Sequence, residues 1–165
     1  RLAAERVRCA GRCRVAGQAL ERAAVISDNG EHDAHGAAVA VAASDTFASE
    51  IGCMDPRVRM ITTFKPCEQG ENGGFSPNGQ LAAAIGSSVV AVLTYIAWWL
   101  TAADTSSTNG TQLCAVLAII GWLGCQIDSY LGALLENRGY MSKGAVNASA
   151  ISGGVIMMFA YLASL

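Results

Sequence analysis

Residues Gly121 to Glu136 decide the fold of this chain, and their sequence is Gly-Trp-Leu-Gly-Cys-Gln-Ile-Asp-Ser-Tyr-Leu-Gly-Ala-Leu-Leu-Glu. They end an apolar run that starts near Leu113, and roughly 20 such residues are enough to cross the hydrocarbon core of a membrane as a helix. Asp128 lies well inside this run, where insertion of a carboxylate costs about 2.5–3.5 kcal/mol. The sequence therefore predicts a membrane-spanning helix that carries an acid at depth.

Small and acidic residues recur along this helix at intervals of three or four, which places them on one helical face. Small residues let a second helix approach closely, so that carboxylates on the same face point into protein and not into lipid. We interpret Asp128 as part of the wall of a polar site, because intramembrane acids are functional candidates by default. Plain helix packing is the alternative, and Glu136 at the membrane boundary fits a solvated position equally well. The residues of this face are Gly121, Gly124, Asp128, Gly132 and Glu136.

The composition is that of a membrane protein with a polar segment. Of the 165 residues, 52% are hydrophobic and only 15% are charged. The net charge of −2 provides no basic surface for nucleic acid, so no nucleic-acid partner is expected. None of the six cysteines forms a C-x-x-C pair, and we predict neither a disulfide framework nor a zinc site.

Hydropathy predicts an all-α integral membrane bundle with two clear spans. A third apolar segment at the C-terminus is either a third span or an exposed tail, and we predict the span. The predicted parts are an Arg-rich, amphipathic and polar N-terminal segment (1–35) and a membrane domain (36–165), with spans at about 81–103, 113–135 and 150–165 and a Gly-rich loop at 53–80.

The N-terminal segment is predicted to lie outside the bundle. Charged residues between Arg1 and Arg12 repeat on one helical face, which indicates a solvated surface helix or a helix on an anionic membrane surface. His32 and His35 have a spacing that metal ligands also use, but no further ligand set accompanies them. We therefore predict no metal site there.

Basic residues in the loops orient the bundle. The loops at 53–80 and 136–149 together carry five lysines and arginines, whereas the loop at 104–112 carries none. Basic loops accumulate on the cytoplasmic side of membrane proteins. The sequence therefore predicts that the first two loops share one membrane face and that the third lies opposite.

The chain from Gly36 to Ile51 is first small and apolar and then acidic. Its apolar part has only seven residues, which is too short to span. As a helix, it would place Asp45, Ser49 and Gly52 on one face with an acid beside them. The groups that the predicted topology gathers at one membrane face are Asp45, Glu50, the Gly-rich loop, the C-terminal end of the 113–135 span and Asn147.

The loop at 53–80 has the chemistry of a phosphate-binding segment. Its centre is Gly70-Glu-Asn-Gly-Gly74, and hydroxyl and cationic side chains flank it. Glycine-rich backbone offers N–H groups to phosphate, and cations add favourable charge. No Walker pattern is present, so a flexible connector remains the alternative.

Three blocks of sequence together resemble a known family. The first contains Ser44-Asp-Thr-Phe-Ala-Ser-Glu-Ile-Gly52, Pro56-Arg57, Ile61-Thr-Thr-Phe-Lys65 and Gly70-Glu-Asn-Gly-Gly-Phe-Ser76; the second is Gly121-x-x-Gly-x-x-Ile-Asp-Ser-x-Leu-Gly-Ala133; the third is Val146-Asn147. These blocks lie in order over roughly residues 40–155. They resemble the polytopic membrane family, formerly a domain of unknown function, that includes plant phytyl-phosphate kinase and human transmembrane protein nineteen.

The resemblance implies an isoprenoid phosphate kinase, which transfers the terminal phosphate of a nucleotide, CTP or another nucleoside triphosphate, to phytyl or another prenyl monophosphate. Such transfer depends mainly on positioning and charge neutralisation. Asp45, Glu50 and Asp128 are then the candidate catalytic residues and Mg²⁺ ligands. The candidate nucleotide- and phosphate-binding residues are Arg57, Thr63, Lys65, Asn72, Gly73, Gly74, Ser76 and Asn147.

The N-terminal region departs from the family pattern. The family's chains usually have several apolar helices ahead of the first block, and here an Arg-rich polar segment stands in that place. On this interpretation the upstream helices are missing or diverged, and a non-catalytic structural subunit of a larger complex is the alternative function. A proton-coupled transporter has less support, because only one acid lies clearly inside a span. The expected partners are the lipid bilayer, a prenyl phosphate and other membrane subunits.

The expected location is a membrane, with a plastid membrane favoured over the endoplasmic reticulum. Asn109-Gly-Thr111 is an N-glycosylation sequon in the loop opposite the proposed site. A glycan there would indicate a membrane of the secretory pathway, and its absence would be compatible with a plastid membrane.

Overall fold

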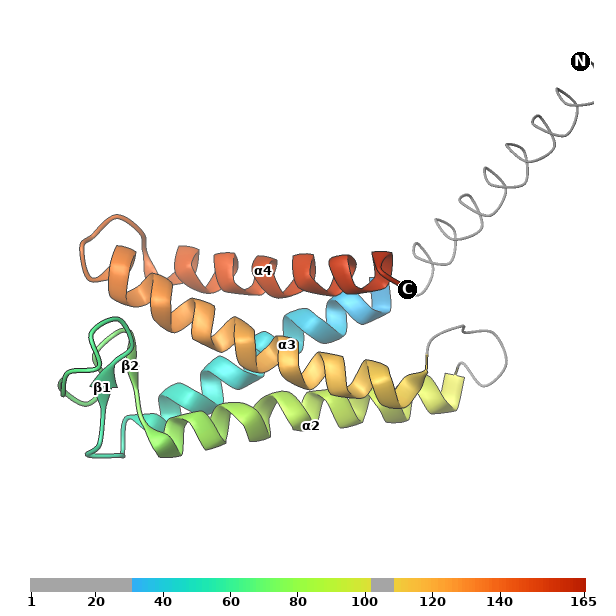
Figure 1. Ribbon diagram of the computed structural model, residues 1–165, viewed down its shortest axis with the longest axis horizontal. Helices are drawn as coiled ribbons and strands as arrows, with labels where there is room; N and C mark the ends of the chain where they lie inside the picture. Colours follow the sequence, from blue (N-terminus) through green and yellow to red (C-terminus); the bar gives the residue numbers. More distant parts are fainter. Residues whose placement is uncertain (1–30, 102–108) are drawn as a thin grey trace, which may run out of the picture.

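The computed structural model describes residues 31–101 and 109–165, which form a helical bundle with a small β-hairpin at one end (Figure 1). Residues 31–52 are helical and precede the hairpin. The surface helix that the sequence predicts near the N-terminus lies outside the described residues. The other elements are β1 (Arg59–Met60), β2 (Gly74–Phe75), α2 (Pro77–Thr101), α3 (Gly110–Leu131), the π-helical segment η1 (Gly132–Glu136) and α4 (Lys143–Ala163).

Three of the described helices are long and apolar enough to cross a membrane. The candidate spans are Pro77–Leu100, Gly110–Glu136 and Lys143–Ser164. Their outer faces expose large apolar side chains, such as Ile85 and Ile156, that would be costly in water but suit lipid. The prediction of an all-α integral membrane bundle with three spans is confirmed.

The third span begins earlier than the sequence predicted. The sequence placed a polar connector before residue 150, but α4 already begins at Lys143. Ser142 caps this helix, because its Oγ accepts a hydrogen bond from the Ala145 backbone N–H at 3.3 Å. Asn147 therefore lies within α4 and not in a loop.

The hairpin and the ends of several helices lie together at one end of the bundle, on the left of Figure 1. β1 and β2 are antiparallel, with Arg59 opposite Phe75 and Met60 opposite Gly74. The segment between α3 and α4 lies at the same end (Figure 1). The two basic loops therefore share one end, which agrees with the expectation from their charge.

The helix over residues 31–52 runs through the bundle in the same direction as α3 and packs closely against it (Figure 1). A methyl group on Gly121 would lie 2.9 Å from Cβ of Ala40, and one on Gly124 would overlap Val41. Such distances are shorter than real packed side chains tolerate. The glycines of α3 thus permit the close helix approach that their spacing predicted.

The 31–52 helix also contacts α2. Ser44 is buried and its Oγ donates to the carbonyl oxygen of Ala83 at 3.0 Å. The apolar core lies in the half of the bundle away from the hairpin, where Leu113, Leu117 and Met158 are buried together. The half of the bundle next to the hairpin is therefore left for polar groups.

Replacing Gly124 by alanine would force a methyl group against Val41, and overpacking of this kind costs about 1–3 kcal/mol of unfolding free energy. We expect Gly124→Ala to unfold at a lower denaturant concentration in detergent micelles, and Val41→Ala in the same chain to recover most of the loss. Gly153→Ala is the matched control, because its methyl group would meet only Ile127 Cδ1 at 3.6 Å and alanine favours a helix. Equal stability of Gly124→Ala and the wild type would contradict the packing described.

Candidate functional site

Asp45 and Asp128 come together in the polar half of the bundle. Their carboxyl groups are in hydrogen-bonding contact, although the residues are far apart in sequence. Each lies four residues beyond the contact between Val41 and Gly124, so the parallel packing of the two helices brings them together. Asp128 lies roughly 8 Å from the middle of its span, counted at 1.5 Å per residue. Two acids, each of which is costly inside a membrane, therefore lie side by side at this depth.

Asn147 links α4 to the acid pair. In the amide orientation that satisfies both neighbours, its nitrogen donates to Asp128 Oδ1 at 3.0 Å and to the carbonyl oxygen of Lys143 at 3.1 Å. The first turn of α4 is thereby fixed against the acids. The ammonium group of Lys143 also interacts electrostatically with both Asp45 and Asp128.

A cavity surrounds the acid pair at the hairpin end of the bundle. The ends of four helices and the Gly-rich loop line it. Its volume of about 130 Å³ is small beside the roughly 300–1,000 Å³ of pockets that enclose a whole small molecule. A larger ligand could therefore place only a small group inside it, and the rest would lie outside. The charged residues in its lining are Asp45, Glu71, Asp128, Glu136 and Lys143.

The Gly-rich loop fits tightly against the C-terminal end of α3. Gly73 has a φ of +81°, and a methyl group there would lie 2.8 Å from the carbonyl oxygen of Ser129 and overlap Ala133. Only glycine tolerates both conditions. The carbonyl oxygen of Asn72 accepts a hydrogen bond from Asn137 Nδ2 at 2.9 Å. The loop is thus held in place where it lines the cavity and is not a free connector.

The end of α3 changes from an α-helix to a π-helix where this loop packs. The Asn137 N–H donates to the Gly132 carbonyl oxygen, five residues back, at 3.1 Å. Short π-helical segments are rare and occur frequently at functional sites. The segment ends at Glu136, which lines the cavity. Glu136, for which the sequence left both a position in the site and a solvated one open, is thus half-buried at the edge of this cavity.

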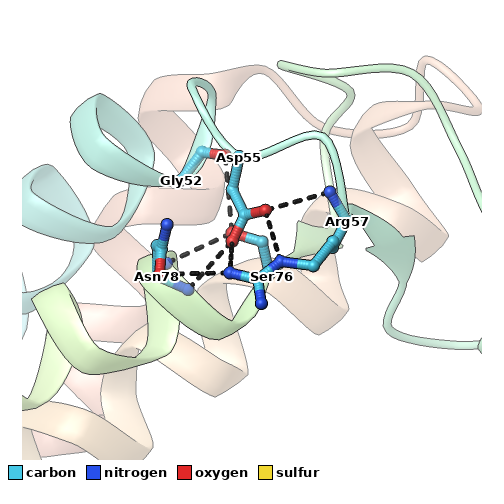
Figure 2. Close-up of polar contacts among 6 residues, drawn as sticks. Gly52, Asp55, Arg57, Ser76 and Asn78 are labelled. Atoms are coloured by element: carbon cyan, nitrogen blue, oxygen red, sulfur yellow. Dashed lines mark hydrogen bonds and ion pairs between the residues drawn. The ribbon is translucent and has the colours of Figure 1, made fainter.

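A buried carboxylate anchors the other side of the loop (Figure 2). Asp55 Oδ1 accepts from the backbone N–H and Nε of Arg57, both at 3.0 Å, and Oδ2 accepts from the Asn78 N–H at 3.1 Å. Asn78 is in the first turn of α2, where N–H groups lack partners within the helix. Ser76 caps the same turn, since its Oγ accepts from the Gly79 N–H at 3.1 Å. The start of α2 is thereby tied to the loop.

Some of the predicted site residues line the cavity, and others lie outside it. Glu50 is exposed on the 31–52 helix and is not part of the cavity lining. Arg57 instead pairs with Asp55, and Thr63 and Lys65 are exposed on the hairpin away from the cavity. Asn147 reaches the site through Asp128. The predicted residues that line the cavity are Asp45, Asn72, Gly73, Gly74, Ser76 and Asp128.

Several lining residues were missed by sequence reasoning. Lys143 was assigned to a connector, although Ser142 before it is a helix-capping residue and Asn147 follows it by one turn. Glu71 and Ser129 stand next to predicted site residues and line the cavity too. No sequence pattern predicted that Gln80 lines the cavity, because its position there depends on how α2 packs against α3.

The acid pair supplies part of the ligand set that a magnesium ion would need. Mg²⁺ is usually held by one or two carboxylates, with waters and substrate phosphates completing its shell. Asp45 and Asp128 supply two carboxylates. Among the residues that the structure describes, no group of three or more His, Cys, Asp or Glu side chains is arranged to hold a metal. The three-acid set that includes Glu50 is therefore not assembled, and a cation here would depend on ligands from the substrate.

Three spans around a polar cavity at one end define an integral membrane protein, and residues 22–162 match the family described as integral membrane protein DUF92. The chain belongs to this family. It is similar to Protein PGR of Arabidopsis thaliana, with 39% identity over 101 residues, which are 59% of this chain and 35% of that protein.

The chain is also similar to an uncharacterized membrane protein of Methanocaldococcus jannaschii. The identity is 33% over 125 residues, which are 74% of this chain and 48% of the relative. This chain therefore spans between about a third and a half of the length of these two relatives. No solved structure matches it.

Hydrogen bonds from Arg57 lower the pKa of Asp55 from 3.8 to about 2. The carboxylate therefore stabilises the fold above about pH 4, and this contribution is lost as the pH falls from 4 towards 2. We expect Asp55→Asn to be less stable than the wild type at pH 6 and the difference to shrink at pH 2–3. Thermal unfolding in detergent at each pH measures the stability of the variant and of the wild type. Glu68→Gln, an exposed acid of the same loop, should show no such difference, and a gap for Asp55→Asn that is independent of pH would contradict the account.

Proposed function

We propose that this chain carries the phosphoryl-transfer site of a membrane prenyl-phosphate kinase. The donor would be CTP or another nucleoside triphosphate, and the acceptor a phytyl or other prenyl monophosphate. The observation that carries the proposal is one cavity, at the end of membrane-spanning helices, that combines the Asp45–Asp128 pair with a glycine-rich loop. Membership of an integral membrane family with a plant relative is consistent with it.

The chemistry of the acceptor explains why such a cavity would suffice. An oxygen of the prenyl monophosphate attacks the terminal phosphorus of the donor, the bond from that phosphorus to the bridging oxygen breaks, and a nucleoside diphosphate leaves. The product is a prenyl diphosphate. A phosphate monoester is mostly ionised at pH 7, so the attacking oxygen needs no general base. The site has to position the phosphates and neutralise their charge, which is the main requirement of phosphoryl transfer.

The carboxylates of Asp45 and Asp128 then act as ligands and not as bases. A Mg²⁺ ion held by both would neutralise charge on the transferred phosphate. Gly73 and Gly74 line the cavity on the loop side. The Gly74 N–H donates to the Glu71 carbonyl oxygen at 2.9 Å, so the Gly73 N–H would be the backbone donor of this pair to a phosphate oxygen. The resemblance also implicated Arg57, Thr63 and Lys65, and a phosphate contact by any of them stays a prediction.

The prenyl chain would lie outside the cavity, along the helices. The cavity has room only for the reacting groups, and an isoprenoid chain is apolar. Ala48 lines the cavity, and its neighbours Phe47 and Ile51 expose 41% and 39% of their surface at the same end of the 31–52 helix. A lipid phosphate would thus meet the acids at headgroup level while its chain remained in an apolar environment.

A non-catalytic membrane subunit is the second candidate function. It is favoured by the coverage of the relatives, because this chain matches only 35% of one and 48% of the other. If parts of the relatives beyond that match supply nucleotide contacts, the present residues would serve as packing within a larger assembly. In a kinase the two acids are required for turnover, whereas in a structural subunit they would affect only the stability of the helical bundle.

Acid substitutions separate the two functions. In nanodiscs with phytyl phosphate, Mg²⁺ and labelled CTP, we expect Asp45→Asn and Asp128→Asn to lower the transfer rate about 100-fold or more, because each removes a carboxylate ligand of the Mg²⁺ ion that would neutralise the transferred phosphate. Glu50→Gln should change the rate by less than about threefold, since Glu50 does not line the cavity. Glu68→Gln is the control for loss of an exposed acid.

Absence of transfer by the wild type, with nucleotide and prenyl phosphate both varied, would reject the kinase and leave the structural subunit. Retention of wild-type turnover by Asp128→Asn would reject the assigned role of the acid pair while keeping the activity.

We also propose a plastid membrane as the location, in keeping with the plant relative. Asn109 is exposed, and its Oδ1 accepts a hydrogen bond from the Thr111 N–H at 3.1 Å, which caps α3. We expect protein isolated from its native membrane to carry no glycan at Asn109, so that glycosidase treatment leaves its electrophoretic mobility unchanged. A shift on treatment would place the protein in the secretory pathway.

A further inference from the structure

We propose that Lys143 is the phosphate-binding cation of this site and that its ammonium group, which Asp45 and Asp128 attract, turns to a substrate phosphate when a metal ion occupies the acids. This inference rests on the proposed function, because it assigns one contact within the same cavity. Lys143 belongs to none of the sequence blocks that carry the family resemblance.

The backbone of Lys143 is fixed while its side chain is long and flexible. Lys143 is the first residue of α4, and its carbonyl oxygen accepts from Asn147, whose amide also binds Asp128. The Ser142 cap holds the same turn from the other side. From this fixed position the ammonium group stands on a four-carbon stem, which lets it move a few ångströms without a change in the fold.

The charge of the cavity makes such a cation necessary. Within the described parts of the chain, Lys143 is the only basic residue in the lining, against four carboxylates. Phosphate groups would be repelled by that lining unless positive charge accompanied them. Arg57 is not part of the lining, and its Nε and one terminal nitrogen donate to Asp55 at 3.0 Å. A substrate phosphate therefore depends on Lys143 together with a metal ion.

This arrangement gives Lys143 opposite effects on the two kinds of ligand. It competes with a divalent cation, because both are attracted to Asp45 and Asp128. It assists a phosphate, because an ammonium group donates charge-assisted hydrogen bonds to phosphate oxygens. A residue that only supported the fold would affect binding of both ligands in the same direction.

The test uses the purified wild type and the variants Lys143→Ala and Lys143→Arg in nanodiscs, with three probes: Mn²⁺ alone, magnesium triphosphate and phytyl phosphate with Mg²⁺. We expect Lys143→Ala to bind Mn²⁺ several-fold more tightly and at least one phosphate probe about tenfold more weakly. Lys143→Arg keeps the charge and should stay near the wild type. Arg138→Ala is the matched control, because it removes one positive charge from an exposed position in the adjacent loop.

The two phosphate probes tell which substrate Lys143 contacts, the donor polyphosphate or the lipid headgroup, and weakening of either supports the proposal. Weaker binding of Mn²⁺ and phosphate together would show a structural role, and unchanged binding of all probes would show no role. Both results overturn the proposal. Since binding needs no turnover, a wild type that binds but never transfers phosphate would reject the kinase function separately.

Discussion

The close packing of the 31–52 helix against α3 is the constraint on which the rest of the structure depends. Gly121 and Gly124 leave space for Ala40 and Val41, and a methyl group at either glycine position would come closer to these residues than packed atoms tolerate. Because the two helices run in the same direction, one further turn along both places Asp45 beside Asp128. A packing interaction between small apolar residues thereby determines where two costly acids meet inside a membrane protein.

The polar half of the bundle depends on this contact in turn. The Gly-rich loop is held on one side by Asp55, which ties it to the start of α2, and on the other by the fit of Gly73 into the end of α3. Asn147 draws the start of α4 towards the same acids. Elements from four parts of the chain thus converge on one cavity at the hairpin end of the bundle.

Much of the fold was predictable because it follows from local patterns. Hydropathy located the spans, and the spacing of Gly121, Gly124 and Asp128 indicated a face for close helix contact. The position of Lys143 and the exclusion of Glu50 from the site were not predictable, because they depend on which turns of different helices meet. The π-helical turn that brings Glu136 into the cavity also has no local signature, since it arises where the loop packs against α3.

The acids of two separate segments share one cavity, Asp45 from the 31–52 helix and Asp128 from α3. The most direct measurement is chemical cross-linking of Asp45→Cys/Asp128→Cys in an otherwise cysteine-free chain, folded in nanodiscs. We expect a short thiol-specific cross-linker to join the two positions within the chain in most molecules. Efficient labelling of both thiols without any intramolecular cross-link would show that the acids lie apart, and a common site would then be excluded.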